Sequence, residues 1–164
     1  MPSRAAVYAG DYAAACAAAL ATSDPPRKVS KQCFHIFPRI REIDALLRAA
    51  PAWRDRIVES HPEGVFMALN GWRPLQYPKK VKSRPHPPGL DERRALLAAA
   101  GLDRDLLEAR PPRGAGADDV LDALACLVLA ERRAAGRAVP LPSPPGRDSH
   151  GLPIAIWVPE PPVR

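Results

Sequence analysis

Proline restricts the fold of this chain more than any other residue type, because 21 of the 164 residues are proline and many of them cluster. The densest clusters lie within 85–88, 140–145 and 159–162. Proline fixes φ and has no backbone N–H, so such stretches are unsuited to helix interiors and central strands. Regular structure is therefore expected mainly between the clusters. Residues 140–164 are expected to form a proline-rich closing segment with one strand.

The composition predicts one domain over residues 1–164, with a thin core. Hydrophobic residues make up 46% of the chain, but aromatic residues make up only 5%. Much of the apolar count is alanine, as in 12–21 and 98–100, and alanine buries little area per residue. A chain of this length is too short for two full domains of average size.

The charge and the cysteines point to a basic protein of the cytoplasm. The formal charge is +6, which favours contact with polyanions such as nucleic acid; arginine-rich codon usage explains the same excess without any partner. Three scattered cysteines, Cys16, Cys33 and Cys126, form no zinc or disulfide pattern and fit a reducing compartment. No apolar run approaches the roughly 20 residues that cross a bilayer, so no membrane contact is expected.

Helical signals are more frequent than strand signals. A helix over 40–50 is indicated by apolar residues at helical spacing, and one over 62–69 by a proline in its first turn and Asn-Gly at its end. The strongest signal covers 118–135, with acids in the first turn and Gly136 as the stop. The expected elements are helices over 11–20, 40–50, 62–69, 91–100, 103–109 and 118–135, and short strands over 56–61 and 154–158.

Three aspartates open the helix expected over 118–135. Asp118, Asp119 and Asp122 share one helical face by their spacing, and the helix continues as apolar nearly all round, which is typical of a buried helix. A buried carboxylate needs a hydrogen bond, an opposite charge or a metal ion. Two interpretations stay open: Asp118 and Asp119 cap the helix while Asp122 pairs with an arginine, or the aspartates hold a metal.

Glu59 and Glu63 form a second acidic pair at the predicted junction between strand 56–61 and helix 62–69. Glu63 is also suited to the positive end of that helix without any ligand. Oxygen ligands from separate elements suit Mg²⁺ or Mn²⁺, and two such ions can promote phosphodiester hydrolysis. Glu59, Glu63, Asp119 and Asp122 are therefore candidate catalytic residues.

A basic segment follows, with Lys79, Lys80, Lys82 and Arg84 as candidate phosphate ligands. Trp72 or Tyr77 is available for stacking on an unpaired base. A solvated basic loop explains the same residues equally well. The four histidines lie at unrelated spacings, and no zinc motif, phosphate-binding glycine loop or nucleophile elbow is present.

Several strings in the chain together resemble one bacterial protein family. They are 58–63 (VESHPE), 66–71 (FMALNG), 78–80 (PKK) and 118–125 (DDVLDALA), supported by 31–32, 38–44 and 148–157. In this order they resemble DUF429, described as predicted RNase H-like nucleases. Separately, the Asp119-x-x-Asp122 helix is similar to the closing acidic helix of RuvC-type resolvases, which share that fold.

The resemblance implies an α/β, RNase H-like fold and a nuclease site. Glu59, Asp119 and Asp122 would hold Mg²⁺ or Mn²⁺, and Glu63 would assist. Lys79 and Lys80 would lie near a phosphate. Family members begin with a first strand bearing aspartate in a Gly-x-Asp-Gly setting, followed by an Asp-x-Pro acid, and this chain has neither. We therefore expect an N-terminally truncated, mainly helical domain with about two short strands and impaired hydrolysis. The alternative is a non-catalytic nucleic-acid-binding or interaction module.

Overall fold

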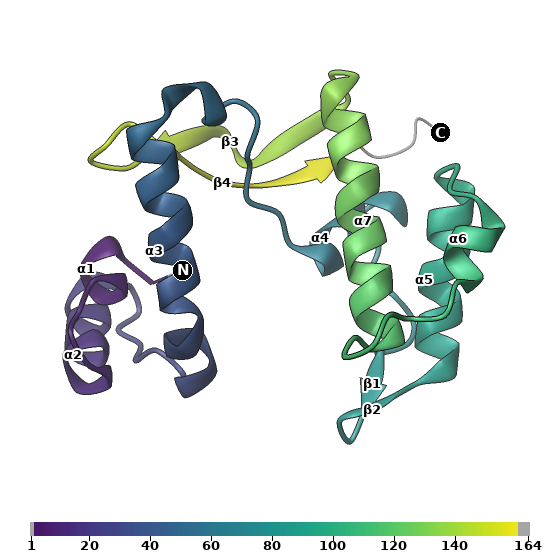
Figure 1. Ribbon diagram of the computed structural model, residues 1–164, viewed down its shortest axis with the longest axis horizontal. Coiled ribbons are helices and arrows are strands. Elements are labelled where there is room, and N and C mark those ends of the chain that lie inside the picture. The colour runs from purple at the N-terminus through teal and green to yellow at the C-terminus, as the bar shows by residue number, and fades with distance from the viewer. Residues whose placement is uncertain (1, 161–164) are drawn as a thin grey trace. The chain divides into compact units, whose positions relative to one another are not determined.

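Helices dominate residues 2–160, which are the part of the chain that the computed structural model describes. The structure contains α1 (Arg4–Val7), α2 (Tyr12–Thr22), α3 (Lys31–Ala49), the 3₁₀ turn η1 (Pro51–Trp53), α4 (Pro62–Leu69), β1 (Lys80–Val81), β2 (Arg84–Pro85), α5 (Pro87–Ala99), α6 (Arg104–Glu108), α7 (Ala117–Ala134), β3 (Ala138–Arg147) and β4 (Pro153–Pro159) (Figure 1). These elements form two compact units that divide after Ile57. The predicted mixed α/β class is confirmed at this level. Residues 161–164 of the predicted closing segment lie outside the described residues.

The first unit consists of α1, α2, α3 and η1, and each of its three α-helices begins at a side-chain cap. Ser3, Asp11 and Ser30 accept hydrogen bonds from backbone N–H groups of the first helical turns. Such caps satisfy donors that the helix itself leaves unpaired. The predicted helix over 11–20 is confirmed as α2. The helix predicted over 40–50 starts earlier, because the Ser30 cap sets its beginning and the chain passes through Pro38 within α3.

Asp44 connects α3 to α1 through a nearly buried ion-pair network. Its side chain is 11% exposed and pairs with Arg4 and with Arg48, the latter at 3.0 Å from Nε to Oδ2. The Tyr8 hydroxyl donates to the same Oδ2 at 2.6 Å. Burial acts to raise the pKa of Asp44, but the hydrogen bonds from Tyr8 and Arg4 outweigh it and hold the pKa below its usual value. The carboxylate is therefore favoured in its charged form.

Acid is expected to remove the contribution of Asp44 to stability. Because its pKa is lower in the folded chain than in the unfolded chain, where it is about 3.9, its stabilising effect is complete above that value. The effect is lost as pH falls through the lower, folded pKa. Thermal unfolding of the wild type and of Asp44→Asn checks this between roughly pH 7 and 2.5. The wild type should unfold at a higher midpoint temperature than Asp44→Asn near neutral pH, and this difference should shrink only in acid. A difference that stays the same or grows in acid contradicts the prediction.

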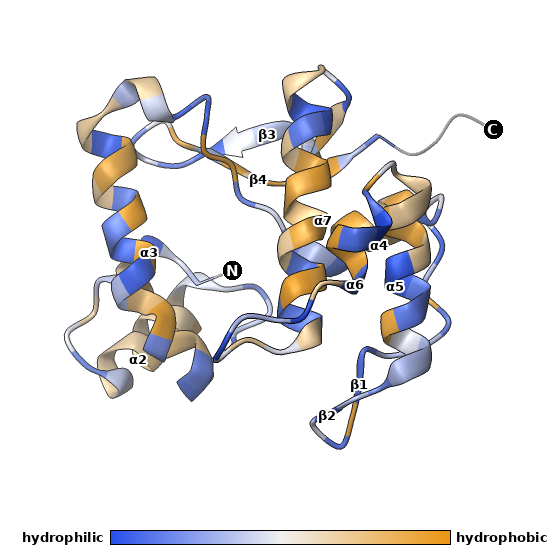
Figure 2. Cartoon of the chain, turned by 45° about the vertical axis from the view of Figure 1, so that its right-hand side comes forward, coloured by the Kyte–Doolittle hydropathy of each residue, from blue (hydrophilic) through white to orange (hydrophobic). Residues whose placement is uncertain are grey.

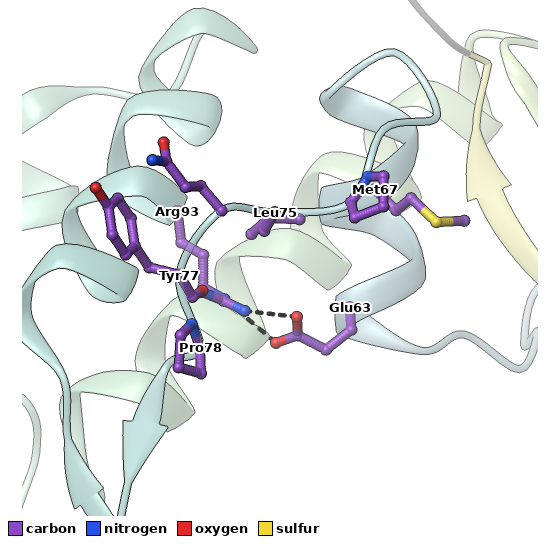
Figure 3. Close-up of a pocket in the computed structure, with 8 residues that line it drawn as sticks. Glu63, Met67, Leu75, Tyr77, Pro78 and Arg93 are labelled. Atoms are coloured by element: carbon purple, nitrogen blue, oxygen red, sulfur yellow. Dashed lines mark hydrogen bonds and ion pairs between the residues drawn. The ribbon is translucent and has the colours of Figure 1, made fainter.

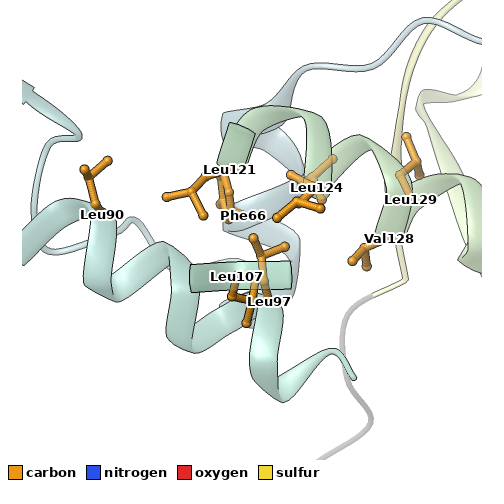
Figure 4. Packing of buried hydrophobic residues seen from close by; sticks show 10 residues of the cluster. Phe66, Leu90, Leu97, Leu107, Leu121, Leu124, Val128 and Leu129 are labelled. Carbon is orange, nitrogen blue, oxygen red and sulfur yellow. The ribbon is translucent and has the colours of Figure 1, made fainter. Parts of the chain in front are cut away.

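In the second unit α4 and α5 pack against α7, and α6 packs on α5 and adds to the same core. Figure 2 shows α7 coloured as hydrophobic along much of its length, and Figure 4 shows the leucines that it packs between α5, α6 and α4. Phe66 from α4 and Leu97 from α5 are fully buried, and Leu107 from α6 is 6% exposed. On α7 the buried members of this core are Leu121, Leu124, Ala125, Val128 and Leu129. The buried character predicted for the acidic helix is thus confirmed on one face, whereas Leu127 stays 41% exposed.

Two small antiparallel sheets complete the second unit. β1 and β2 form a hairpin whose turn residues, Lys82 and Ser83, both have positive φ. β3 pairs with β4 from Ala138 opposite Pro159 to Arg147 opposite Pro153, with an irregularity between Leu141 and Gly146. The predicted strand over 154–158 is confirmed within β4. None of the helices in the described residues is long and apolar enough to cross a membrane.

One predicted strand is absent from the described residues, and one strand that was not predicted is present. Residues 56–61 are not a strand: the backbone N–H of Trp157 donates to Glu59 O at 2.8 Å, and Ser60 forms a single parallel bridge with Trp157. The N–H of Ile57 is already used in a turn with Trp53, so pairing does not extend along the β-branched residues. Conversely, the proline-rich stretch that we expected to be irregular forms β3. A strand that pairs along only one edge tolerates proline, because the missing N–H can face away from the partner.

Candidate functional site

Acidic and basic residues that the sequence singles out meet, together with Arg93, in one ion-pair cluster of the second unit. Its members come from α4, α5, α7 and the start of the β1–β2 hairpin. We use the name ion-pair cluster for Glu63, Lys79, Lys80, Arg93, Asp118 and Asp122. Three carboxylates and three cations make this set electrically balanced.

Arg93 anchors Glu63 within the cluster. Its side chain is only 3% exposed, and its Nη2 lies 2.6 Å from Glu63 Oε2. Its Nε donates to Glu63 Oε1 at 3.2 Å, and its Nη1 donates to the carbonyls of Gly89 and Tyr77 at 2.8 and 3.2 Å. Figure 3 shows the two dashed contacts between this guanidinium and the carboxylate. A buried guanidinium held in this two-pronged way fixes the position of Glu63.

A small open cavity lies beside this pair. Its volume is about 350 Å³, and Met67, Leu75, Tyr77 and Pro78 line it together with the Glu63–Arg93 pair. Glu92 holds the loop on one side by accepting from the backbone N–H groups of Gln76 and Tyr77 at 2.7 and 2.9 Å. The loop that leads to the basic hairpin is therefore tied to α5.

Lys79 lies between two carboxylates from different helices. Its Nζ is 2.6 Å from Asp122 Oδ2 and 3.6 Å from Glu63 Oε1. The Lys79 and Asp122 side chains are 26% and 25% exposed, so water only partly screens their attraction. The other carboxylate oxygen, Asp122 Oδ1, is buried and accepts no hydrogen bond from the described residues. The pairing predicted for Asp122 with an arginine is thus made with a lysine instead.

The first two aspartates of α7 have separate roles. Asp118 is 5% exposed and lies 2.7 Å from Lys80 Nζ. Burial acts to raise its pKa, but the hydrogen bond and charge of Lys80 prevail and lower it. Asp119 accepts from the backbone N–H of Gly116 at 2.8 Å and so completes the cap of α7. The capping role is therefore present for Asp119, whereas Asp118 serves an ion pair.

Glu59 and Asp119 do not join the ion-pair cluster. Within the described residues, no ion pair or side-chain hydrogen bond links the Glu59 carboxylate to any cluster member. Its backbone carbonyl instead receives the Trp157 N–H beside β4. Of the four predicted catalytic acids, the structure thus brings together Glu63 and Asp122 only.

The donor set does not fit the predicted Mg²⁺ or Mn²⁺ site. Within residues 2–160, no group of three His, Cys, Asp or Glu side chains is placed to hold a metal ion. The acids that do converge already have Lys79, Lys80 and Arg93 as partners. A two-ion hydrolytic site needs several carboxylates that are free to turn toward the ions. The metal role of Glu59, Asp119 and Asp122 is thus a prediction that rests on the sequence alone.

The hairpin divides the four predicted phosphate ligands into two pairs. Lys79 and Lys80 are engaged with Asp122 and Asp118. Lys82 and Arg84 are exposed, and no carboxylate of the described residues forms an ion pair with them. Lys82 and Ser83 have φ values of 48° and 61°, a conformation that costs non-glycine residues energy. The turn thus presents Lys82 and Arg84 to solvent on a short, defined ribbon.

Arg93 is the functional residue that sequence analysis missed. It carried no motif, but Leu90, Arg93 and Leu97 recur at the spacing of one helix face, and all three are buried. A charged residue between two buried leucines at that spacing is a signal for a paired internal charge. This spacing could have identified Arg93 as a paired internal charge. Its partner could not be identified in the same way, because Glu63 lies 30 positions away in the sequence.

Comparison with known proteins gives a family but no closer relative. No curated protein and no solved structure matches the chain. The RNase H-like fold implied by the sequence resemblance therefore stays a prediction. The family model described as "Protein of unknown function (DUF429)" matches residues 1–147. This match spans most of the chain and confirms the predicted assignment: the chain belongs to the DUF429 family.

Proposed function

We propose that this chain binds the phosphate backbone of nucleic acid through the β1–β2 hairpin, without hydrolysing it on its own. The observation that carries the proposal is the exposure of Lys82 and Arg84 on a fixed turn with no carboxylate partner among the described residues. Phosphate contacts by such cations supply affinity that is independent of base sequence. The net charge of +6 adds long-range attraction for a polyanion.

The ion-pair cluster beneath the hairpin supports the non-hydrolytic part of the proposal. A hydrolytic metal site works with carboxylates that are available to the ions, whereas Glu63, Asp118 and Asp122 have cations within 2.7 Å. The same ion pairs hold Lys79 and Lys80 at the base of the ribbon. We assign these two lysines to positioning the hairpin, and Lys82 and Arg84 to contacting phosphate.

Loss of both exposed cations is expected to weaken binding of single-stranded nucleic acid by about 25-fold at 0.1 M salt, since each phosphate contact contributes ~0.7 to the slope of log affinity against log salt. Fluorescence anisotropy with a labelled oligonucleotide measures this for Lys82→Gln/Arg84→Gln. The salt slope should fall by roughly 1.4. DNA and RNA probes of equal length test which polymer is preferred.

A matched control removes the same charge elsewhere. Arg110 and Arg113 lie exposed in the connection between α6 and α7, so Arg110→Gln/Arg113→Gln lowers the net charge equally without altering the hairpin. The Arg110→Gln/Arg113→Gln variant should weaken binding by less than threefold, which is a loss of less than about 0.7 kcal/mol in binding free energy. Equal losses in the two double variants would mean that only the net charge attracts nucleic acid, and the hairpin would not be the binding site.

Metal-dependent phosphodiester hydrolysis is the second candidate function. The resemblance to RNase H-like nucleases implies it, and the buried, unpartnered Asp122 Oδ1 is an oxygen that a cation could take. Cleavage of an oligonucleotide by the purified wild type in Mn²⁺, abolished by Asp119→Ala/Asp122→Ala, would favour this candidate. If the oligonucleotide is still uncleaved after prolonged incubation with the wild type and Mn²⁺, the result favours binding without hydrolysis.

A further inference from the structure

Lys79 occupies the position between Glu63 and Asp122 where a divalent cation would have to lie. Its ammonium group is 2.6 Å from one carboxylate and 3.6 Å from the other. Glu63 is further neutralised by the buried Arg93. These four side chains carry no net charge together, so the site offers no electrostatic attraction for an additional cation.

The backbone around Lys79 is held from two sides, so the ammonium group is delivered to a fixed place. The His86 N–H donates to Lys79 O at 2.9 Å, and the His86 ring nitrogen Nδ1 lies 3.1 Å from Pro78 O. Gly89 packs so closely that a Cβ there would lie 2.0 Å from Pro78 O. Lys79 therefore extends toward Asp122 from a rigid base.

We propose that Lys79 is the resident cation of the ion-pair cluster and excludes divalent metal from it. Removal of its charge leaves Glu63, Asp122 and Arg93 with a net charge of −1. Both oxygens of Asp122 would then lack a partner, because Oδ1 has none already among the described residues. One or two carboxylates with water are sufficient for Mg²⁺ or Mn²⁺. The inference concerns these residues alone and does not depend on nucleic-acid binding.

The test is a Mn²⁺ titration of the purified full-length chain without nucleic acid, followed by electron paramagnetic resonance of the free ion. Lys79→Met keeps a long unbranched side chain, one atom shorter than that of lysine, and removes its charge. We expect it to bind one Mn²⁺ at least tenfold more tightly than the wild type. Lys28→Met, which removes a lysine charge from the exposed segment before α3, should bind as the wild type does. Lys79→Met/Asp122→Asn should lose the gained affinity.

Three outcomes would overturn the inference. The first is a folded Lys79→Met chain that binds Mn²⁺ no more tightly than the wild type. The second is wild-type binding at a single site that Asp122→Asn abolishes, since the metal would then coexist with Lys79. The third is tighter binding in Lys79→Met that survives Asp122→Asn. If Lys79→Met does not fold, Lys79→Gln, which retains an N–H donor for Asp122, replaces it under the same criteria.

Discussion

Glu63→Leu is expected to destabilise the second unit by about 3–4 kcal/mol, toward the lower end of the cost of stranding one member of a buried ion pair. The lower end applies because the Arg93 side chain is buried whereas that of Glu63 is 37% exposed. The stranded group is Arg93, whose side chain is 3% exposed. It would keep its hydrogen bonds to the carbonyls of Gly89 and Tyr77 and its contact with the Phe66 ring, but it would lose its carboxylate partner. Urea unfolding of the full chain at neutral pH, followed by circular dichroism, measures the loss.

Two further variants separate this effect from a general sensitivity to lost charge. Asp91→Ala removes an acid from an exposed pair, Asp91–Arg94, in which Asp91 is 69% exposed; it should cost less than about 1 kcal/mol. Glu63→Leu/Arg93→Met removes the stranded charge and should recover much of the stability lost in Glu63→Leu. The explanation fails if Glu63→Leu costs no more than Asp91→Ala, or if the double variant is less stable than the single one.

Gly89→Ala is expected to be nearly as damaging, with a loss of about 3 kcal/mol, at the upper end of the cost of overpacking. An added Cβ would lie 2.0 Å from Pro78 O and 2.7 Å from Pro78 C. Both are backbone atoms, so α5 and the loop before the hairpin must separate. Urea unfolding measures the loss of stability. In the NMR spectrum of the folded variant, the backbone amide resonance of Lys79 should shift.

Gly64→Ala is the matched control on α4. Its Cβ would lie 3.4 Å from Val158 Cγ1, an ordinary contact. Alanine is favoured over glycine within helices by about 1 kcal/mol, so stability should stay equal or rise slightly. If Gly64→Ala and Gly89→Ala are equally destabilising, close packing against Pro78 is not what requires glycine at position 89.

Elements with strong local signals could be predicted from the sequence. Pro62 at the start and Asn70-Gly71 at the end correctly bounded α4, and Gly136 correctly marked the stop of α7. Such signals act through the backbone of a few neighbouring residues. The strand predicted over 56–61 failed because a strand also needs a partner, and its β-branched residues carry no information about one.

The candidate site was less predictable because its contacts join distant positions. Lys79 and Asp122 are 43 residues apart, and in isolation each has several plausible uses. From the sequence we expected Lys79 to contact phosphate and Asp122 to bind a metal or an arginine, whereas in the structure the two pair with each other. Which opposite charge a side chain meets depends on how α5 and α7 pack, and that packing is set by apolar residues elsewhere.

The prolines of β3 affect how this strand could pair with a strand of another molecule. Pro140, Pro142 and Pro144 have no backbone N–H to donate, and β3 is paired in the described residues only with β4. An incoming strand from another molecule needs N–H groups to complete a ladder, and proline supplies none. The unpaired edge of β3 is therefore a poor template for pairing with a strand of another molecule.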